Sequence, residues 1–200
     1  MPPVVNGMRI CGSLWLGFLV VWVIWGFQAK STQVSESVAS RLSYSVLTIA
    51  AFFLMFTETL RVGPLGMPLF PPSPWLGLLG VAVTLAGLGV AIWARAFLGG
   101  NWSASVTVKV EHRLITNGPY RWVRHPIYSG MLLALLGTAL ARNQVRGQLA
   151  VVLLYAGFRI KSRIEERFMT NTFGAEYESY RRDTGGIFPR TRGPKMFRGR

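Results

Sequence analysis

Three long apolar runs separated by polar segments predict membrane-spanning helices. The runs cover residues 10–27, 42–60 and 75–98. Because about 20 apolar residues cross a hydrocarbon core of about 30 Å, each run is predicted to be a transmembrane helix. No small-residue cleavage site follows the first run, which is therefore expected to stay as an anchor. Glu58 lies near the end of the second run, where its carboxylate is expected to reach the interface.

Proline and glycine mark the third run and the loop before it. Residues 61–74 hold five prolines and two glycines, which predicts a rigid surface loop without a helix. The third run contains Gly77, Gly80, Gly87 and Gly89. No strand precedes these glycines, so a phosphate-binding loop is disfavoured, and they are predicted to let helices pack closely in lipid.

Two shorter apolar runs follow, 127–141 and 148–160, with a turn at 142–147 between them. Neither reaches the about 20 residues of a full perpendicular span. They are predicted to form a helical hairpin, 127–160, packed on the first three helices. Apolar and charged residues alternate at helical spacing through 161–169, so the second helix is expected to continue into water.

The C-terminal segment is polar and basic. Gly174 is predicted to end the preceding helix, residues 175–182 to form a short surface helix, and residues 191–200 to be a basic tail. These elements predict an all-α integral membrane protein with about five transmembrane helices, of which the last two form the hairpin.

Composition supports the membrane assignment. Hydrophobic residues make up 50% of the chain and charged residues 15%, which is too apolar for an ordinary soluble domain. The 22 Lys and Arg outnumber the 8 Asp and Glu, but they gather beside apolar runs, where anionic lipid and the topology rule explain them better than nucleic acid does. With one cysteine, Cys11, and two histidines, neither an intrachain disulfide nor a metal site is expected.

The distribution of cations predicts the orientation. Five Lys and Arg lie from Arg95 to Arg124, and eleven lie from Arg159 onward. Cytoplasmic segments carry the excess of such residues, so both regions are predicted to be cytoplasmic and the N-terminus to lie outside. Arg142 and Arg146, at the hairpin turn, count against this orientation but are outnumbered.

The stretch 117–130, Asn-Gly-Pro-Tyr-Arg-Trp-Val-Arg-His-Pro-Ile-Tyr-Ser-Gly, leads into the hairpin. Its two prolines predict an ordered, non-helical connection that ends at His125. Proline is tolerated well in a first helical turn, so Pro126 is expected to start the next helix. Arg121, Arg124 and His125 would then lie at its positive N-terminus, where an anionic ligand is favoured.

A second polar stretch, 159–168, has two interpretations. On a helix, Glu165 lies one turn from Lys161. Glu166 lies one turn from Arg163. This spacing is typical of a solvated helix face with weak ion pairs.

The alternative is that the hairpin returns residues 161–166 to the membrane surface from which His125 and Tyr128 depart. Cations and rings would then form one wall of a pocket and carboxylates the other. Such a pocket suits a partly aromatic ligand that carries both a carboxylate and cationic centres.

Several motifs occur in a fixed order between residues 98 and 189. They are Leu-Gly-Gly-Asn-Trp-Ser at 98–103, His-Arg-Leu-Ile-Thr-Asn-Gly-Pro-Tyr at 112–120, Arg-His-Pro-Ile-Tyr-Ser-Gly at 124–130, Glu-Glu at 165–166 and Phe-Gly-x-Glu-Tyr-x-x-Tyr at 173–180. The ordered set resembles the isoprenylcysteine carboxyl methyltransferase family. The resemblance implies an S-adenosylmethionine-dependent membrane methyltransferase without a Rossmann domain. It divides the chain into a three-helix membrane part, 1–98, a cofactor-binding and catalytic part, 99–190, with a cytoplasmic connection, and the tail.

The resemblance also implies which residues bind the cofactor. They are His112, Arg113, Leu114, Ile115, Tyr120, His125, Pro126, Ile127, Tyr128 and Glu165. Arg124 and Glu166, from the two walls of the predicted pocket, are added to this cofactor-binding set. Lys161 and Arg163 are predicted to orient an acceptor carboxylate, and Lys161 stands where the family has arginine, which leaves the acceptor open. Simpler roles also fit: His125 could brace the turn before Pro126, and the tyrosines could be interfacial anchors.

The leading hypothesis is methyl transfer from S-adenosylmethionine to a membrane-partitioned acceptor, first of all the carboxylate of an isoprenylcysteine. Methylation of a nitrogen or sulfur on a phospholipid or small molecule is the nearest alternative. A similar Arg-His-x-x-Tyr turn in membrane sterol reductases keeps an NADPH-dependent reductase open, and a non-catalytic assembly factor is a third hypothesis. The expected partners are the bilayer and a lipophilic acceptor, with no nucleic acid, and the sequence predicts no particular oligomeric state.

Overall fold

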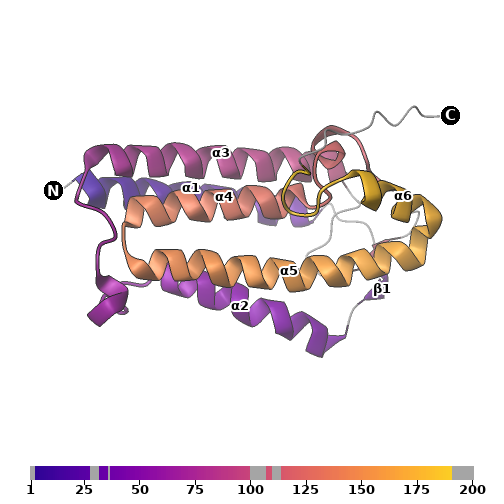
Figure 1. Ribbon diagram of the computed structural model, residues 1–200, viewed down its shortest axis with the longest axis horizontal. Coiled ribbons are helices and arrows are strands. Elements are labelled where there is room, and N and C mark those ends of the chain that lie inside the picture. Colours follow the sequence, from indigo (N-terminus) through magenta and orange to yellow (C-terminus); the bar gives the residue numbers. More distant parts are fainter. Residues whose placement is uncertain (1–2, 28–31, 36, 100–106, 110–113, 191–200) are drawn as a thin grey trace.

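Long helices run side by side along the longest axis of the protein (Figure 1). The computed structural model describes residues 3–27, 32–35, 37–99, 107–109 and 114–190. The helices are α1 (Pro3–Gly26), α2 (Val38–Phe56), α3 (Pro74–Leu98), α4 (Pro126–Arg142), α5 (Val145–Phe173) and α6 (Ala175–Asp183). The connections contain the 3-10 turns η1 (Gly63–Gly66) and η3 (Gly118–Arg121) and the strands β1 (Thr32–Ser35) and β2 (Thr107–Lys109). The predicted all-α fold is confirmed, apart from the short antiparallel pair β1–β2, which was not predicted.

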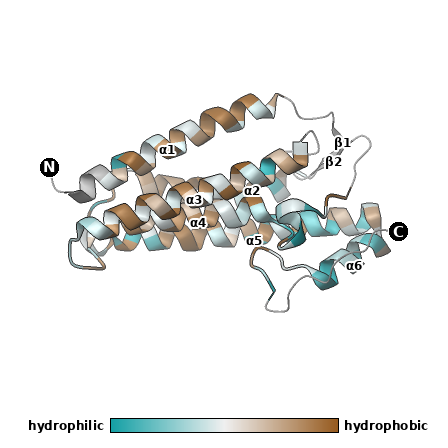
Figure 2. Cartoon of the chain, turned by 90° about the horizontal axis from the view of Figure 1, so that it is seen from above, coloured by the Kyte–Doolittle hydropathy of each residue, from teal (hydrophilic) through white to brown (hydrophobic). Residues whose placement is uncertain are grey.

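Three helices are long and apolar enough to cross a membrane. Within the described residues these are Gly7–Gly26 of α1, Val38–Phe56 and Pro74–Leu98, and α4 is a shorter apolar helix. Large apolar side chains on all three point outward, as lipid contact requires; Leu16, Ile49 and Leu78 are each more than half exposed. Hydrophilic residues gather around α6 (Figure 2). The chain is an integral membrane protein.

The second helix departs from its predicted boundaries. It begins at Val38, because the Ser37 hydroxyl caps it by accepting a hydrogen bond from the Ser40 amide at 3.2 Å. It ends at Phe56, so Glu58 lies in the following loop and not in the helix. The proline-rich loop also contains the 3-10 turn Gly63–Gly66, where no helix was predicted.

Small residues let α3 and α4 pack closely, as predicted. A side-chain carbon placed on Gly87 would lie 2.3 Å from the Ala134 backbone nitrogen, and one on Gly137 would lie 2.4 Å from that of Thr84. Helices in lipid associate through such close packing and not through the hydrophobic effect. Gly89 faces open space, so its predicted packing role was wrong. The other two tight glycines of this contact are Gly80 and Gly130.

Buried polar groups also join α1, α3 and α4. Cys11 Sγ lies 3.4 Å from Thr84 Oγ1, which lies 3.2 Å from Thr138 Oγ1. Trp15 Nε1 donates to the same Thr138 oxygen at 2.9 Å. Polar groups inside a membrane protein need internal partners, and these contacts supply them between helices.

The α4–α5 hairpin turns at Asn143 and Gln144, a tighter turn than the predicted 142–147. Asn143 has a left-handed backbone, with φ 50°. Its side chain accepts from the Phe70 amide at 3.0 Å and donates to the Phe70 carbonyl at 2.8 Å. The end of the hairpin is therefore fixed to the loop between α2 and α3.

The two arginines at the hairpin end are buried and paired, not exposed in a loop. Glu58 forms ion pairs with both: its Oε1 lies 3.1 Å from Arg142 Nη2, and its Oε2 lies 3.3 Å from Arg146 Nη2. Arg146 Nε also donates to Gln144 Oε1 at 2.8 Å. A carboxylate from the α2–α3 loop thus balances part of the charge that the hairpin carries.

The fifth helix is continuous over 29 residues and leaves the bundle at the end where α6 lies (Figure 1). This confirms the predicted continuation through 161–169 and extends it to Phe173. Gly174, with φ 52°, ends the helix as predicted, and α6 follows at once. The predicted basic tail, 191–200, lies outside the described residues.

Candidate functional site

The candidate site lies where α4 begins, near α6. Pro126 occupies the first turn of α4, as predicted, and His125 precedes it as the N-cap residue. The connection before His125 is not free of helix, because Gly118–Arg121 form one 3-10 turn. Gly118 has φ 55°, and a side chain there would meet the Phe97 ring at 2.4 Å, so this turn requires glycine.

A C-terminal strap, residues 184–189, lies along the start of α4 and was not predicted. Two backbone amides before the helix and one hydroxyl in its first turn donate to carbonyl oxygens of the strap. The pairs are Arg124 N with Gly185 O (2.8 Å), His125 N with Gly186 O (3.3 Å), and Ser129 Oγ with Ile187 O. The strap therefore takes the amides of Arg124 and His125, the two residues that precede the helix.

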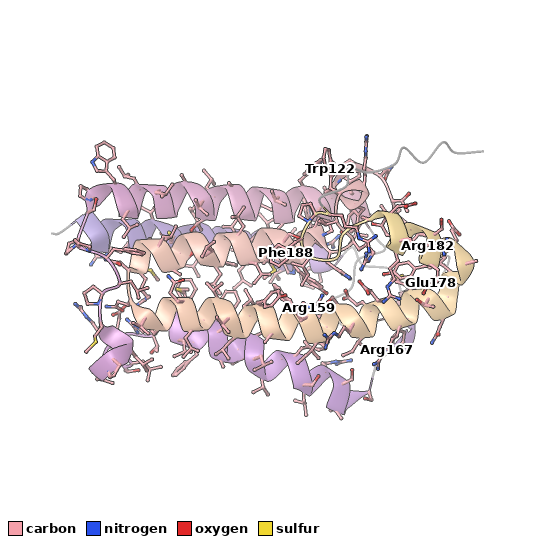
Figure 3. All side chains as sticks on the ribbon, in the orientation of Figure 1. Trp122, Arg159, Arg167, Glu178, Arg182 and Phe188 are labelled. Atoms are coloured by element: carbon pink, nitrogen blue, oxygen red, sulfur yellow. The ribbon has the colours of Figure 1, made fainter. Side chains whose placement is uncertain are left out.

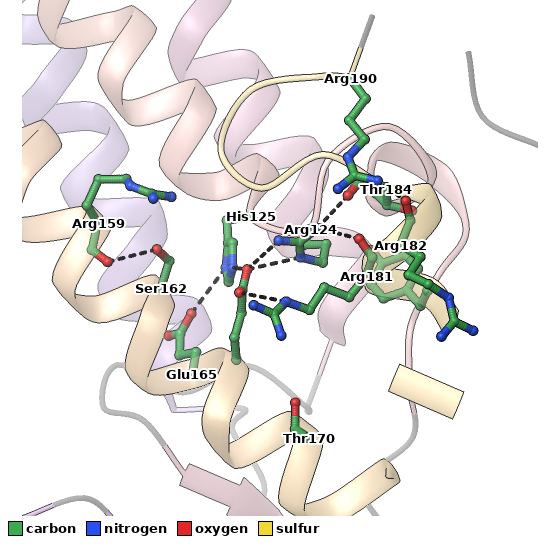
Figure 4. A network of polar contacts seen from close by, with 12 residues as sticks. Arg124, His125, Arg159, Ser162, Glu165, Thr170, Arg181, Arg182, Thr184 and Arg190 are labelled. Atoms are coloured by element: carbon green, nitrogen blue, oxygen red, sulfur yellow. Dashed lines mark hydrogen bonds and ion pairs between the residues drawn. The ribbon is translucent and has the colours of Figure 1, made fainter. Parts of the chain in front are cut away.

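Arg124 joins the strap, α6 and α5. Its guanidinium donates to Glu166 Oε1 from Nε at 3.0 Å and from Nη2 at 2.7 Å. Nη1 donates to the carbonyl oxygens of Arg181, at 3.1 Å, and Thr184 (Figure 4). Arg124 is therefore committed to internal partners.

Arg121, predicted to lie at the same helix N-terminus, stands apart from this cluster. It is exposed, and its guanidinium lies 5.8 Å from the Trp122 ring centroid. Trp122 is itself more than half exposed at the protein surface (Figure 3). This pair therefore belongs to the outer surface.

His125 lies between two carboxylates of α5. Its Nδ1 is 3.3 Å from Glu165 Oε2, and its Nε2 is 3.2 Å from Glu166 Oε1. The Tyr128 hydroxyl donates to Glu165 Oε1 at 2.5 Å. Because both glutamates face α4, the structure shows the pairing across the hairpin, and the interpretation of a solvated helix face was wrong for them.

These ionisable groups shift one another's proton affinity. Burial alone would raise the pKa of Glu166, but hydrogen bonds and positive charge from His125 and Arg124 outweigh burial and lower this pKa to about 2. Burial would also raise the pKa of Glu165, but His125, Lys161 and Tyr128 outweigh burial and lower this pKa. Burial alone would lower the pKa of His125, whereas the two glutamates raise it. A carboxylate at each ring nitrogen favours the doubly protonated imidazolium.

Aromatic rings form the wall beneath this cluster. His125 stacks on Tyr128 at 5.4 Å between centroids, and Tyr128 stacks on Phe158 at 4.5 Å. Lys161 Nζ lies 5.1 Å from the Tyr44 centroid and 5.7 Å from that of Tyr128. The Lys161 ammonium thus contacts two ring faces, one of them from α2, and Tyr44 was not predicted.

Most other predicted residues pack against the helices. Leu114, Ile115, Tyr120, Pro126 and Ile127 are buried or half-buried. The Tyr120 hydroxyl donates to the Ala94 carbonyl at 3.4 Å. Arg163 is exposed on α5, and His112 and Arg113 lie outside the described residues. Within the part of the chain that the structure describes, no three His, Cys, Asp or Glu side chains are grouped to hold a metal ion.

Much of the candidate site lies in a region shared with a known family. A sequence profile described as phospholipid methyltransferase matches residues 75–176, which include all but the first residue of α3, the whole of α4 and the carboxylates of α5. The chain belongs to the phospholipid methyltransferase family. The matched residues include the hairpin and the two polar stretches that flank it, 117–130 and 159–168.

Individual relatives of this family member carry more specific names. A probable protein-S-isoprenylcysteine O-methyltransferase of Oryza sativa subsp. indica is 26% identical over 76% of this chain and 75% of its own. A cobalt-zinc-cadmium resistance protein of Cupriavidus metallidurans is 30% identical over 58% of this chain and 48% of its own. The solved structure of a eukaryotic intramembrane Ras methyltransferase, isoprenylcysteine carboxyl methyltransferase, is 26% identical and has a TM-score of 0.58, covering 76% of this chain and 54% of that one.

The chain therefore spans about half the length of two of these three proteins. The resemblance to the isoprenylcysteine carboxyl methyltransferase family, predicted from the motifs, is confirmed by the named relatives and by the shared fold.

Proposed function

We propose that this family member transfers a methyl group from S-adenosylmethionine to the carboxylate of an isoprenylcysteine-like acceptor in the bilayer. The observation that carries the proposal is the cluster of His125, Tyr128, Glu165 and Glu166 at the polar end of the membrane helices. It brings together the two motif-bearing segments on either side of the hairpin. Relatives named as methyltransferases of isoprenylcysteine support the same acceptor class.

The donors and acceptors of the cluster fit a zwitterionic cofactor. When bound, S-adenosylmethionine supplies an activated methyl group on a cationic sulfur. Glu165 and Glu166 would accept hydrogen bonds from its ammonium, and the His125 ring, held between these two carboxylates, would contact the cofactor beside them. The Tyr128 ring face would favour a positive centre by about 0.5 to 2 kcal/mol. The buried or half-buried residues Leu114, Ile115, Tyr120, Pro126 and Ile127 would form the border of this site.

Lys161 is the residue that we assign to the acceptor. Its ammonium lies over Tyr44 and Tyr128 and its charge acts on Glu165, so it would orient an acceptor carboxylate by charge. A carboxylate is already nucleophilic, so the protein has to align it and exclude water, and no general base is needed. Arg163 is exposed, and we leave it out of the proposed catalytic set.

We further propose that the site faces the cytoplasm and the N-terminus lies outside. The start of α1 and the α4–α5 turn lie at one end of the bundle, and the site lies at the other, where the cations predominate (Figure 1). A cysteine at the exposed position Glu176, in a Cys11→Ser background, should react with a membrane-impermeant thiol reagent only after cells are opened. Labelling of intact cells would reverse the orientation.

Binding of S-adenosylhomocysteine by the purified protein tests the cofactor assignment. We expect saturable binding in titration calorimetry. Glu165→Gln should weaken it about 30-fold, because losing a charge-assisted hydrogen bond costs about 2 kcal/mol. Glu176→Gln, on the exposed face of α6, is the matched control and should bind normally. Saturable NADPH binding with no response to S-adenosylhomocysteine would favour the reductase and reject the proposal.

The acceptor is tested by transfer of a radiolabelled methyl group to a prenylcysteine analogue and, separately, to extracted lipid. Label in the prenylcysteine ester is the expected result. Transfer to lipid alone would keep the methyltransferase and replace the acceptor by a phospholipid. One observation favours that second candidate over the others, the description of the matching family.

A further inference from the structure

We propose that the C-terminal strap, residues 184–189, is a positioning element that holds His125 in the orientation needed for cofactor binding. The proposal rests on the function proposed above, in which His125 contacts the cofactor. It gives Arg124 and Gly185 a role in cofactor binding although neither would touch the cofactor. For Arg124, it replaces the direct cofactor contact that the sequence predicts.

The backbone of His125 is oriented by the strap as well as by α4. As the N-cap residue it has φ −125° and ψ 58°, outside the helical region. Its amide has no partner within a helix turn and donates to Gly186 O at 3.3 Å. The Ser129 hydroxyl links the two segments, since it lies 3.2 Å from the His125 carbonyl and also donates to Ile187 O. Losing the strap would remove one hydrogen-bond partner of His125 and one of Ser129.

The strap is itself held in two places, near each of its ends. Ile187 is 2% exposed and packs in the apolar core. At the other end, Arg124 donates to the Thr184 carbonyl and, with the same guanidinium, to Glu166. Glu166 is also a partner of the His125 ring, at 3.2 Å. One side chain therefore couples the strap to the carboxylate that orients the imidazole.

Two adjacent glycines of the strap differ in the space around them. A side-chain carbon on Gly185 would lie 2.1 Å from the Phe188 carbonyl oxygen and 2.9 Å from the Arg190 amide nitrogen, both backbone atoms. On Gly186 the nearest atom would be Arg124 Nη2, at 3.6 Å, an ordinary contact. Gly185→Ala should therefore open the strap, whereas Gly186→Ala should leave it closed.

The experiment follows the imidazole directly. The chain has two histidines, so ¹⁵N-histidine labelling gives a spectrum that a His112→Asn variant assigns. We expect Gly185→Ala to shift or broaden the His125 ring signals and to weaken S-adenosylhomocysteine binding at least about tenfold, since small displacements of a positioned group cost that much. Gly186→Ala should change neither. Helical circular dichroism of both variants confirms that they are folded.

A second variant keeps the test decisive if Gly185→Ala does not fold. Arg124→Lys retains the positive charge beside Glu166 but lacks the planar fork that reaches Glu166 and the Thr184 carbonyl together. It should produce the same change in the His125 signals. Unchanged His125 signals in folded Gly185→Ala or Arg124→Lys protein would overturn the proposal. If wild-type protein binds no S-adenosylhomocysteine, the proposed function fails, while the His125 spectra still decide whether the strap positions the ring.

Discussion

Replacing Glu166 by glutamine should destabilise the folded protein by roughly 3 to 5 kcal/mol, the cost of removing one partner from a buried ion pair. Arg124 and His125, with side chains only 10% and 8% exposed, would keep their burial and lose their shared carboxylate. The glutamine oxygen can still accept a hydrogen bond, but it carries no charge to balance the two cations. The effect is measured as a lower free energy of unfolding in detergent.

Glu176→Gln is the control for this substitution, because Glu176 is exposed on α6 and should change stability by no more than about 0.5 kcal/mol. If Glu166→Gln and the control have the same free energy of unfolding, the charges of the cluster are screened by water in the folded protein. In that case its ion pairs contribute as little as ordinary surface pairs do.

The second large effect is the change of stability with pH. The free energy of unfolding should be greatest between pH 4.5 and pH 6.5, which are the ordinary pKa values of Glu166 and His125. The pKa of His125 is raised in the folded protein, so its contribution is complete below pH 6.5 and is lost as the pH rises through the raised value. The pKa of Glu166 is lowered to about 2, so its contribution is complete above pH 4.5 and is lost as the pH falls toward 2.

Thermal unfolding midpoints in detergent, recorded across this range of pH, check both limbs. His125→Asn keeps a polar side chain that cannot titrate, so it should flatten the alkaline limb and leave a loss of stability on the acid side. An alkaline limb that persists in His125→Asn would assign it to a different group.

The membrane helices and the hairpin could be predicted because apolar run length and helical spacing are local properties of the chain. The return of residues 161–166 to the end of the bundle where His125 and Tyr128 lie also followed, once residues 142–147 were recognised as a turn that reverses direction. The pairing of Arg124 with Glu166 was not predicted. Buried charges need partners, and this ion pair supplies one for each of them.

The strap and Tyr44 could not be predicted, for two different reasons. The strap binds α4 through its carbonyl oxygens, which every residue carries, so Gly185 and Gly186 leave no chemical signal in the sequence. Tyr44 is a single ring in an apolar run, and only the way α2 crosses α5 brings it to Lys161. The helices can cross closely there because Gly157 has no side chain. A side-chain carbon at that position would lie 3.2 Å from the Tyr44 carbonyl oxygen.

The burial of Cys11 gives the protein a chemical reporter of its own. It is the only cysteine in the sequence, has no exposed surface, and lies against Thr84 of α3. A maleimide that fluoresces on reaction would find no accessible thiol while α1 stays packed, so the rate of dye attachment measures how often α1 separates from α3. Every substitution suggested above, apart from the orientation variant, leaves this thiol in place and can be compared by reaction rate without any added label.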